Sequence, residues 1–143
     1  DNFNYERYMM GAQMLGMSQR CFDECVSYAK ERNTFGKPLI EHQVIRHKLA
    51  DMSAKIDAMD AYLNQVAQLM NDGEKPVAEI SKIKFFCSEC LESIASEAMQ
   101  ILGGAGYLRG NPVERIYREV KVMAIGGGSK EIMKDLTVKQ MGL

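Results

Sequence analysis

Apolar residues recur along the chain at alternating spacings of three and four, the period of one face of an α-helix. The clearest stretch is residues 45–70, in which no step of this pattern is broken. Its apolar positions are Ile45, Leu49, Met52, Ile56, Met59, Leu63, Val66 and Met70. A stripe of this length needs another helix along its whole length. The pattern therefore predicts a helix of about 28 residues, roughly 40 Å long.

Two further stretches show the same period. The first covers residues 5–31, with Asn4 as the expected N-cap. Its apolar seam consists of Met10, Met14, Met17, Cys21, Cys25 and Tyr28. The other covers residues 76–102, where Pro76 suits the first helical position and the glycine-rich residues 103–106 stop the helix. Its seam consists of Ile80, Ile83, Cys87, Cys90, Ile94, Ala98 and Ile101.

The remaining chain predicts two shorter helices and no strand of any strength. One helix runs over residues 112–123, and after the triplet Gly126-Gly127-Gly128 a last helix covers residues 129–140. Three long amphipathic helices with short connections favour an all-α fold. We expect one domain over residues 1–143, an antiparallel four-helix bundle, up-down-up-down, with a short extra helix before the last one.

Composition agrees with one globular domain of the usual size. The chain has 143 residues, of which 46% are apolar and 26% charged, and a formal net charge of -1. No basic surplus points to nucleic acid. The longest uncharged stretch, residues 8–19, is too short to span a membrane. The 11 methionines fit as adaptable filling between helices.

Four cysteines raise the alternatives of two disulfides or one zinc site. The pairs Cys21/Cys25 and Cys87/Cys90 have spacings that invite the zinc interpretation. All four, however, lie on the apolar seams of predicted helices. Buried thiols that act as small hydrophobes are favoured over either alternative. Free thiols would suit a reducing intracellular compartment.

A helical bundle also raises the question of a di-iron centre, which needs Glu-x-x-His on two helices. The chain has only two histidines, His42 and His47, and the residues three positions before them are Leu39 and Val44. A carboxylate-bridged metal site is therefore excluded, and we predict no metal. A nucleophilic triad is not indicated either, because the chain has no Gly-x-Ser-x-Gly motif.

Two loops carry residue types that packing alone does not explain. Residues 31–37 place the fork-shaped donor Arg32, the hydroxyl of Thr34 and the ring of Phe35 at a helix end, which suits a phosphate or a flat cofactor. The same residues would also make a helix C-terminus with favourable cations and a glycine turn. Residues 100–104 could let a ligand approach bare backbone, or could simply end a helix.

Taken together, these segments resemble one known family. The segments, in order, are RNTFGK at residues 32–37, HQ at 42–43, QILGGAGY at 100–107, PVER at 112–115 and REVK at 118–121. They are similar to the C-terminal helical domain of the acyl-CoA dehydrogenases, over essentially the whole chain. The resemblance implies an FAD enzyme that oxidises an acyl-CoA thioester to the trans-2-enoyl-CoA, in fatty-acid or branched-chain acyl catabolism. Electrons would pass to electron-transferring flavoprotein.

The resemblance also implies that the chain is a fragment, without the family's N-terminal helical and middle β domains. Alone it would fold as a bundle but catalyse nothing. The full enzyme would be a homotetramer, a dimer of dimers. It would be cytoplasmic in a bacterium or lie in the mitochondrial matrix of a eukaryote. An acyl-CoA oxidase, and a non-catalytic helical interaction module on the same scaffold, stay open as alternatives.

Cofactor residues follow from the resemblance position by position. Arg32, Asn33 and Thr34 would meet the FAD diphosphate across a dimer interface, and His42 and Gln43 would also lie on FAD. The adenosine part of the neighbouring subunit's cofactor would be received by Gln100, Ile101, Leu102, Gly103 and Gly104. Ser129, Lys130 and Glu131, which come directly after the catalytic loop, would also contact FAD. Substrate contacts are expected from Asn4, Tyr5, Arg7 and Gly128.

The catalytic base is where this sequence departs from most of the family. The reaction needs a carboxylate that takes the α-proton while hydride leaves the β-carbon, and most members supply it in a Tyr-Glu-Gly-Thr segment. Here the matching residues are Gly126-Gly127-Gly128-Ser129, which offer no carboxylate. The long-chain and isovaleryl types instead carry the base on the first helix, in Glu-Arg followed by apolar residues.

This chain has that pattern in Glu6-Arg7-Tyr8-Met9-Met10. Glu6 is therefore the predicted base. The alternative is an acidic residue in the first helical turn, which stabilises the helix dipole by a few tenths of a kcal/mol. For Arg7 the alternative to a contact with the CoA side of the substrate is a solvated cation.

Overall fold

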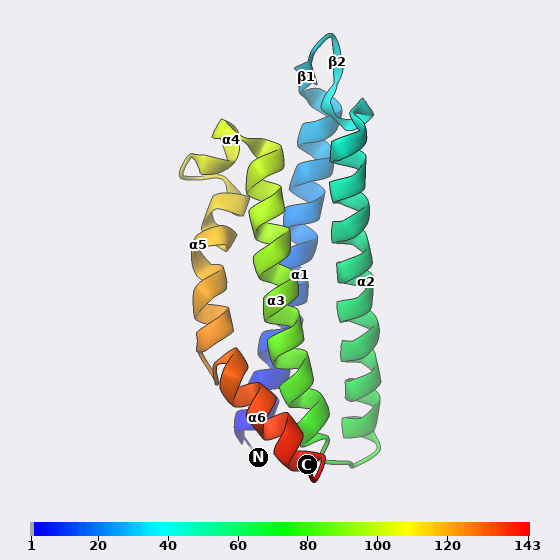
Figure 1. The fold of residues 1–143 in the computed structure, drawn as a ribbon, viewed down its shortest axis with the longest axis vertical. Helices are drawn as coiled ribbons and strands as arrows, with labels where there is room; N and C mark the ends of the chain where they lie inside the picture. The colour runs from blue at the N-terminus through cyan, green and yellow to red at the C-terminus, as the bar shows by residue number, and fades with distance from the viewer. Residues whose placement is uncertain (1) are drawn as a thin grey trace.

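The computed structural model describes residues 2–143, which form a bundle of helices (Figure 1). The long helices are α1 (Asn2–Glu31), α2 (Gln43–Asn71) and α3 (Val77–Leu102), followed by α5 (Pro112–Ile125) and α6 (Lys130–Gln140). The short elements are β1 (Asn33–Thr34), β2 (Lys37–Pro38), the 3-10 helix η1 (Leu39–Glu41) and the one-turn helix α4 (Gly104–Tyr107). The predicted all-α fold is confirmed.

The fourth position of the bundle is shared by two helices. Figure 1 shows α5 and α6 following one another along the side of α3, while α2 runs antiparallel to both α1 and α3. Helix α3 packs against α1, α2, α5 and α6, so it is the central element. Apolar side chains cover more than one face of α3, including those of Ile83, Leu91 and Ile94, each fully buried.

The predicted apolar seams form the core. In α2 the seven positions from Ile45 to Val66 are all buried, and the seven seam residues of α3 are buried too. All four cysteines are buried and free, as the seam pattern predicts. Gly11 lets α1 approach α3 closely, since a Cβ there would lie 2.5 Å from Cγ2 of Ile83.

Helix boundaries differ from the predicted ones at several ends. Helix α1 begins at Asn2, so Asn4 lies inside it and is not its N-cap. Instead, Oδ1 of Asn4 accepts a hydrogen bond from Nη1 of Arg7 at 3.3 Å. Pro76 occupies the N-cap of α3 and not its first helical position. Ser129 is the N-cap of α6, with its hydroxyl accepting from the backbone N–H of Ile132 at 3.4 Å.

A small hairpin joins α1 to α2, where no strand was predicted. Asn33 pairs with Pro38 and Thr34 with Lys37 in antiparallel register. The two turn residues, Phe35 and Gly36, have φ of 50° and 81°, and two successive positive φ values suit the tight turn of a two-residue hairpin. Strands of two residues are too short to show an alternating pattern, which is why the sequence did not indicate them.

Within the described range, no helix has the length and apolar character needed to cross a bilayer. The same residues hold no group of three His, Cys, Asp or Glu side chains placed to bind a metal ion.

Candidate functional site

The predicted site residues gather at two places far apart in the bundle. Glu6 and Arg7 belong to the first turns of α1, where Arg7 contacts Gly127 in the connection between α5 and α6. The β1–β2 hairpin and α4 lie toward the opposite end of the bundle (Figure 1). Glu6 and Arg32 are separated by about 39 Å along the axis of α1, at 1.5 Å per residue. We call the first group the base cluster (Glu6, Arg7 and residues 126–131) and the second the hairpin cluster (residues 32–43 and 100–104).

In the base cluster the triple glycine packs directly over α1. Gly127 and Gly128 have φ of 71° and 122°, a region that side chains rarely allow. Nε of Arg7 donates to the carbonyl oxygen of Gly127 at 2.9 Å. A Cβ on Gly127 would lie 2.8 Å from Sδ of Met10. The loop therefore has little room for a side chain toward α1 in its present conformation.

Glu6 lies one helical turn before Met10 and on the same face of α1. Its side chain is exposed, and Oε1 accepts a hydrogen bond from Nδ2 of Asn2 at 3.1 Å. Because α1 begins at Asn2, Glu6 belongs to the second turn, where the helix dipole has largely faded. The alternative role of Glu6 in stabilising the first turn loses its basis. Tyr5, another predicted substrate contact, is 57% exposed.

Lys84 belongs to this cluster, although sequence reasoning missed it. Its side chain is fully buried, and Nζ donates to the carbonyl oxygens of Met123 at 2.7 Å and Gly128 at 2.8 Å. Burial, together with the nearby charge of Arg7, lowers the pKa of Lys84 to about 8. A signal was available, since Lys84 follows Ile80 by four positions and precedes Cys87 by three, which places it on the buried seam.

The start of α6 closes the base cluster with side chains that already have partners. Nζ of Lys130 pairs with Glu92 of α3 at 2.7 Å, and Lys121 of α5 pairs with the other oxygen of the same carboxylate. Glu131 is exposed, and its own backbone N–H and the Ser129 hydroxyl hold the pKa of its carboxyl below the ordinary value. Glu92 thus ties together the two helices that flank the triple glycine.

In the hairpin cluster, His42 holds the hairpin against the start of α2. Its Nε2 lies 3.0 Å from the hydroxyl and 3.1 Å from the carbonyl oxygen of Thr34. Its ring also meets the ring of Phe35 edge-on, with centroids 6.2 Å apart. Around this joint Arg32 and Gln43 are exposed, and Phe35 is 98% exposed. The arrangement offers a guanidinium, an amide and a flat ring to a ligand outside the chain.

The end of α3 presents open backbone next to this hairpin end of the bundle. Gly103 has φ of 56°, and a Cβ on Gly103 or Gly104 would meet no atom within 4 Å. Gln100 is exposed, whereas Ile101 and Leu102 are buried, so any contact from these two would come from backbone atoms. Bare backbone beside the exposed amide of Gln100 could receive a flat cofactor group such as the adenosine of FAD.

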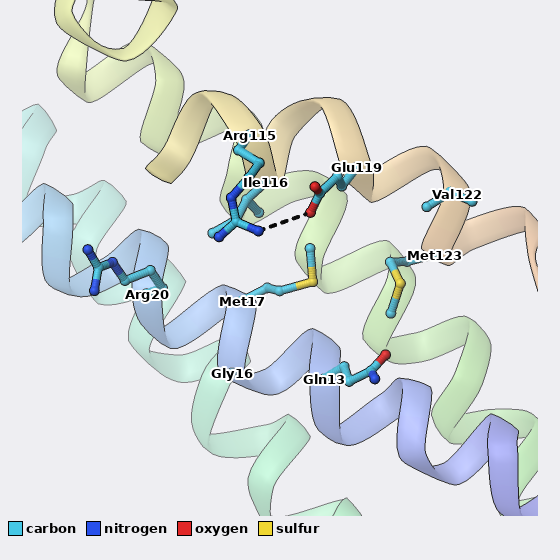
Figure 2. Close-up of a pocket in the computed structure, with 9 residues that line it drawn as sticks. All are labelled: Gln13, Gly16, Met17, Arg20, Arg115, Ile116, Glu119, Val122 and Met123. Atoms are coloured by element: carbon cyan, nitrogen blue, oxygen red, sulfur yellow. Dashed lines mark hydrogen bonds and ion pairs between the residues drawn. The ribbon is translucent and has the colours of Figure 1, made fainter. Parts of the chain in front are cut away.

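A groove between α1 and α5 contains none of the predicted site residues (Figure 2). Its volume is about 460 Å³, and its floor includes Met17, Ile116 and Met123. Figure 2 shows Arg115 and Glu119 paired at its edge, at 3.5 Å, with Arg20 on the facing helix.

Comparison with known proteins gives a consistent result. The family model described as "Acyl-CoA dehydrogenase, C-terminal domain" matches residues 1–142. Cyclohexane-1-carbonyl-CoA dehydrogenase of Geobacter metallireducens is 34% identical over 140 residues, which is 98% of this chain and 37% of that protein. The caffeyl-CoA reductase-Etf complex subunit CarC of Acetobacterium woodii is 36% identical over 128 residues, 90% of this chain and 34% of that protein.

Solved structures agree in fold. The crystal structure of a probable acyl-CoA dehydrogenase from Mycobacterium abscessus matches with a TM-score of 0.95 and 40% identity, covering 98% of this chain and 37% of that one. The chain thus spans little more than a third of the length of the relatives it matches.

Proposed function

Because the chain belongs to the acyl-CoA dehydrogenase family, we propose that it is the C-terminal helical domain of a longer FAD enzyme. The reaction is the α,β-dehydrogenation of an acyl-CoA thioester to the trans-2-enoyl-CoA, with Glu6 as the base. One observation carries this assignment. Glu6 stands one turn before Met10, and Met10 touches the position of Gly127, where most of the family has its catalytic glutamate.

Glu6 would take the proton from the α-carbon of the substrate. In the described chain this carboxylate is exposed, so groups from outside the chain must cover it in the working site. An apolar acyl chain and a flavin ring would exclude water and hold the carboxylate at the proton that it takes. The glycines at 126–128 leave the opposite wall of the site without a competing carboxylate.

Arg7 supports both the loop and the substrate. Its Nε donates to the carbonyl oxygen of Gly127 and its Nη1 donates to Oδ1 of Asn4, so its guanidinium is held in place against the loop. We propose that its remaining donor face receives the CoA side of the substrate. Gly128 would offer open backbone to the substrate. Tyr5 is an exposed ring, and it lines a separate pocket with Asn4, Met70 and Pro76.

The family binds FAD, and the residues of both clusters fit it. The flavin supplies the acceptor for the hydride that leaves the β-carbon. The guanidinium of Arg32 and the amides of Asn33 and Gln43 would hold the diphosphate region, and residues 100–104 the adenosine. At the base cluster, a cofactor would be contacted by Ser129, Lys130 and Glu131, which come directly after the loop.

The two clusters would serve different cofactor molecules. About 39 Å of helix separates Glu6 from Arg32, which argues against both clusters holding one cofactor within a single subunit. The site is then completed by a second subunit, which supports a homo-oligomer, in the full enzyme a dimer of dimers. A reducing compartment, the bacterial cytoplasm or the mitochondrial matrix, fits the four free thiols.

Electron-transferring flavoprotein is the proposed electron partner. The relative from Acetobacterium woodii is named as a subunit of a complex with Etf. Among the relatives, one is named as a dehydrogenase and another as a subunit of a reductase complex. For this chain we propose the oxidative direction, on an acyl-CoA.

The test is Glu6→Gln in the full-length enzyme. We expect dehydrogenation to fall by roughly 10²–10⁴-fold, the usual range for loss of a general base, while FAD stays bound. Glu24→Gln is the matched control, because Glu24 lies on the same helix and pairs with Arg20 outside both clusters. Normal turnover in Glu6→Gln would remove Glu6 as the base.

A further inference from the structure

Lys84 is the one lysine that is fully buried among the residues the structure describes. A buried ammonium is costly unless it is hydrogen-bonded, and a methionine would fill similar space without that cost. What a lysine adds at this position is therefore its charged end. Its Nζ donates hydrogen bonds to the carbonyl oxygen of Met123 at 2.7 Å and to that of Gly128 at 2.8 Å.

These two carbonyls lie on either side of the turn between α5 and α6. Met123 belongs to the last turn of α5, whose carbonyls have no partner within the helix. A lysine that binds such a carbonyl acts as a C-cap, and Lys84 does so from a different helix. Gly128 lies at the far end of the turn, just before the N-cap of α6. One ammonium thus fixes the entry and the exit of the triple glycine.

Arg7 completes the arrangement from the other side. It binds the carbonyl of Gly127, while Lys84 binds the carbonyl of Gly128, so two cations from α1 and α3 hold consecutive peptide groups. Three glycines in a row lose more conformational freedom on ordering than other residues would. A loop of this composition needs such contacts to keep one conformation.

We infer that Lys84 is a positioning residue that holds the Gly126–Gly128 loop in place over α1, the helix that carries Glu6. The structural part of this inference stands on the hydrogen bonds alone. Its catalytic part rests on the proposed function, because the loop forms the wall of the substrate site only if Glu6 is the base. A displaced loop would leave the substrate misaligned with the base, and small misplacements of that kind are expensive in rate.

The test compares Lys84→Met with Lys82→Met in the full-length enzyme. Lys82 is on the same helix and pairs with Glu79 of that helix, so it controls for the loss of a positive charge on α3. Three quantities are measured: amide hydrogen exchange of residues 126–129 and of α2, kcat and KM, and the urea midpoint. Lys84→Gln, which keeps an uncharged NH₂ donor group on a shorter side chain, is the second variant in case Lys84→Met does not fold.

For Lys84→Met we expect exchange at residues 126–129 to accelerate at least tenfold while α2 keeps its protection. We also expect kcat to fall at least tenfold, with a change of less than threefold in KM and no loss of FAD, and an intermediate effect in Lys84→Gln. Unchanged exchange at residues 126–129, or acceleration spread equally over α2, would overturn the inference.

The two proposals fail separately. Full activity in Glu6→Gln would refute the proposed base, yet the exchange experiment would still decide whether Lys84 holds the loop. Conversely, a Lys84→Met enzyme with a loosened loop and normal kcat would show that the loop position does not matter for turnover, and would refute the catalytic part alone.

Discussion

Sδ of Met10 lies 2.8 Å from the point that a Cβ on Gly127 would occupy. The residue one turn after Glu6 therefore fills the space where a side chain at position 127 would begin. A glutamate at position 127 would need room that Met10 takes here. This crowding is consistent with the proposed placement of the base on α1.

The first prediction concerns a transfer of the proposed base from position 6 on α1 to position 127 in the loop. Glu6→Gly should abolish turnover, and adding Gly127→Glu should recover about tenfold over Glu6→Gly alone, because the end of a methionine side chain can move aside. The recovery stays partial because position 127 has φ of 71°, which strains any residue other than glycine. Stopped-flow reduction of the flavin by acyl-CoA measures it.

Glu6→Gly with Gly127→Gln is the matched control, since it adds the same bulk without a carboxylate. Equal rates in the glutamate and glutamine double variants would mean that the triple glycine has a role other than leaving room for the base.

The helices could be predicted because burial follows the apolar period. Ile45 to Val66 on α2 are buried where the three-and-four spacing places them, and the same holds for the seam of α3. The hairpin could not be predicted, because it depends on a positive φ at Phe35, a residue type that seldom adopts one. The expectation that the base lies on the first helix came from the family resemblance. No apolar or polar pattern near Glu6 predicts that role.

Lys84 shows a different limit of sequence reasoning. Its place on the seam can be read from its neighbours, but its partners are 39 and 44 residues further along the chain. Only the packing of α5 and α6 against α3 brings them together. A charged residue on an apolar seam therefore indicates that a buried polar contact is present in the fold. The partners in that contact can be identified only from the structure.

The close contact between α1 and α3 at Gly11 gives the second prediction. Gly11→Ala should destabilise the chain by roughly 1–3 kcal/mol, because the added Cβ would lie 2.5 Å from Ile83 and 3.1 Å from Leu63. Gly16→Ala on the same helix has no atom within 4 Å of its Cβ and should stabilise by about 0.5–1 kcal/mol. Urea unfolding followed by circular dichroism compares the two, and a stabilised Gly11→Ala would contradict the close packing of α1 and α3.

Buried thiols give the third prediction. Burial raises the pKa of Cys21, Cys25 and Cys87 from 9.0 to about 12. Between these values the unfolded chain loses thiol protons that the folded chain keeps, so the free energy of unfolding falls as pH rises from about 9 toward 12. The loss is roughly 1.4 kcal/mol per thiol at pH 10. Urea titrations at pH 7 to 10 measure it, and Cys25→Ala should show a shallower decline, whereas an identical decline would contradict the assignment.

Lys84 should act in the opposite direction, which is the fourth prediction. Its pKa is lowered from 10.5 to about 8, so between these values the unfolded chain binds more protons than the folded one. The contribution of this group to stability therefore increases as pH rises through that window. Lys84→Met removes the increase, and its stability should decline more steeply above pH 8 than that of the unaltered chain. Parallel pH profiles for the two would argue against a desolvated ammonium at this position.

The separation of the two clusters gives the last prediction. If Glu6 of one subunit works with a cofactor held by Arg32 of another, two inactive variants should complement each other. Co-expression of Glu6→Gln with Arg32→Ala would produce hybrid dimers in which one site carries both changes and the other neither. With random pairing, activity should return to about a quarter of the unaltered level. Co-expression of Glu6→Gln with Glu6→Gly, which alters one cluster only, should restore nothing. Absence of recovery in the first pair, with hybrids shown to form by differential tags, would place both clusters on the same cofactor or on none.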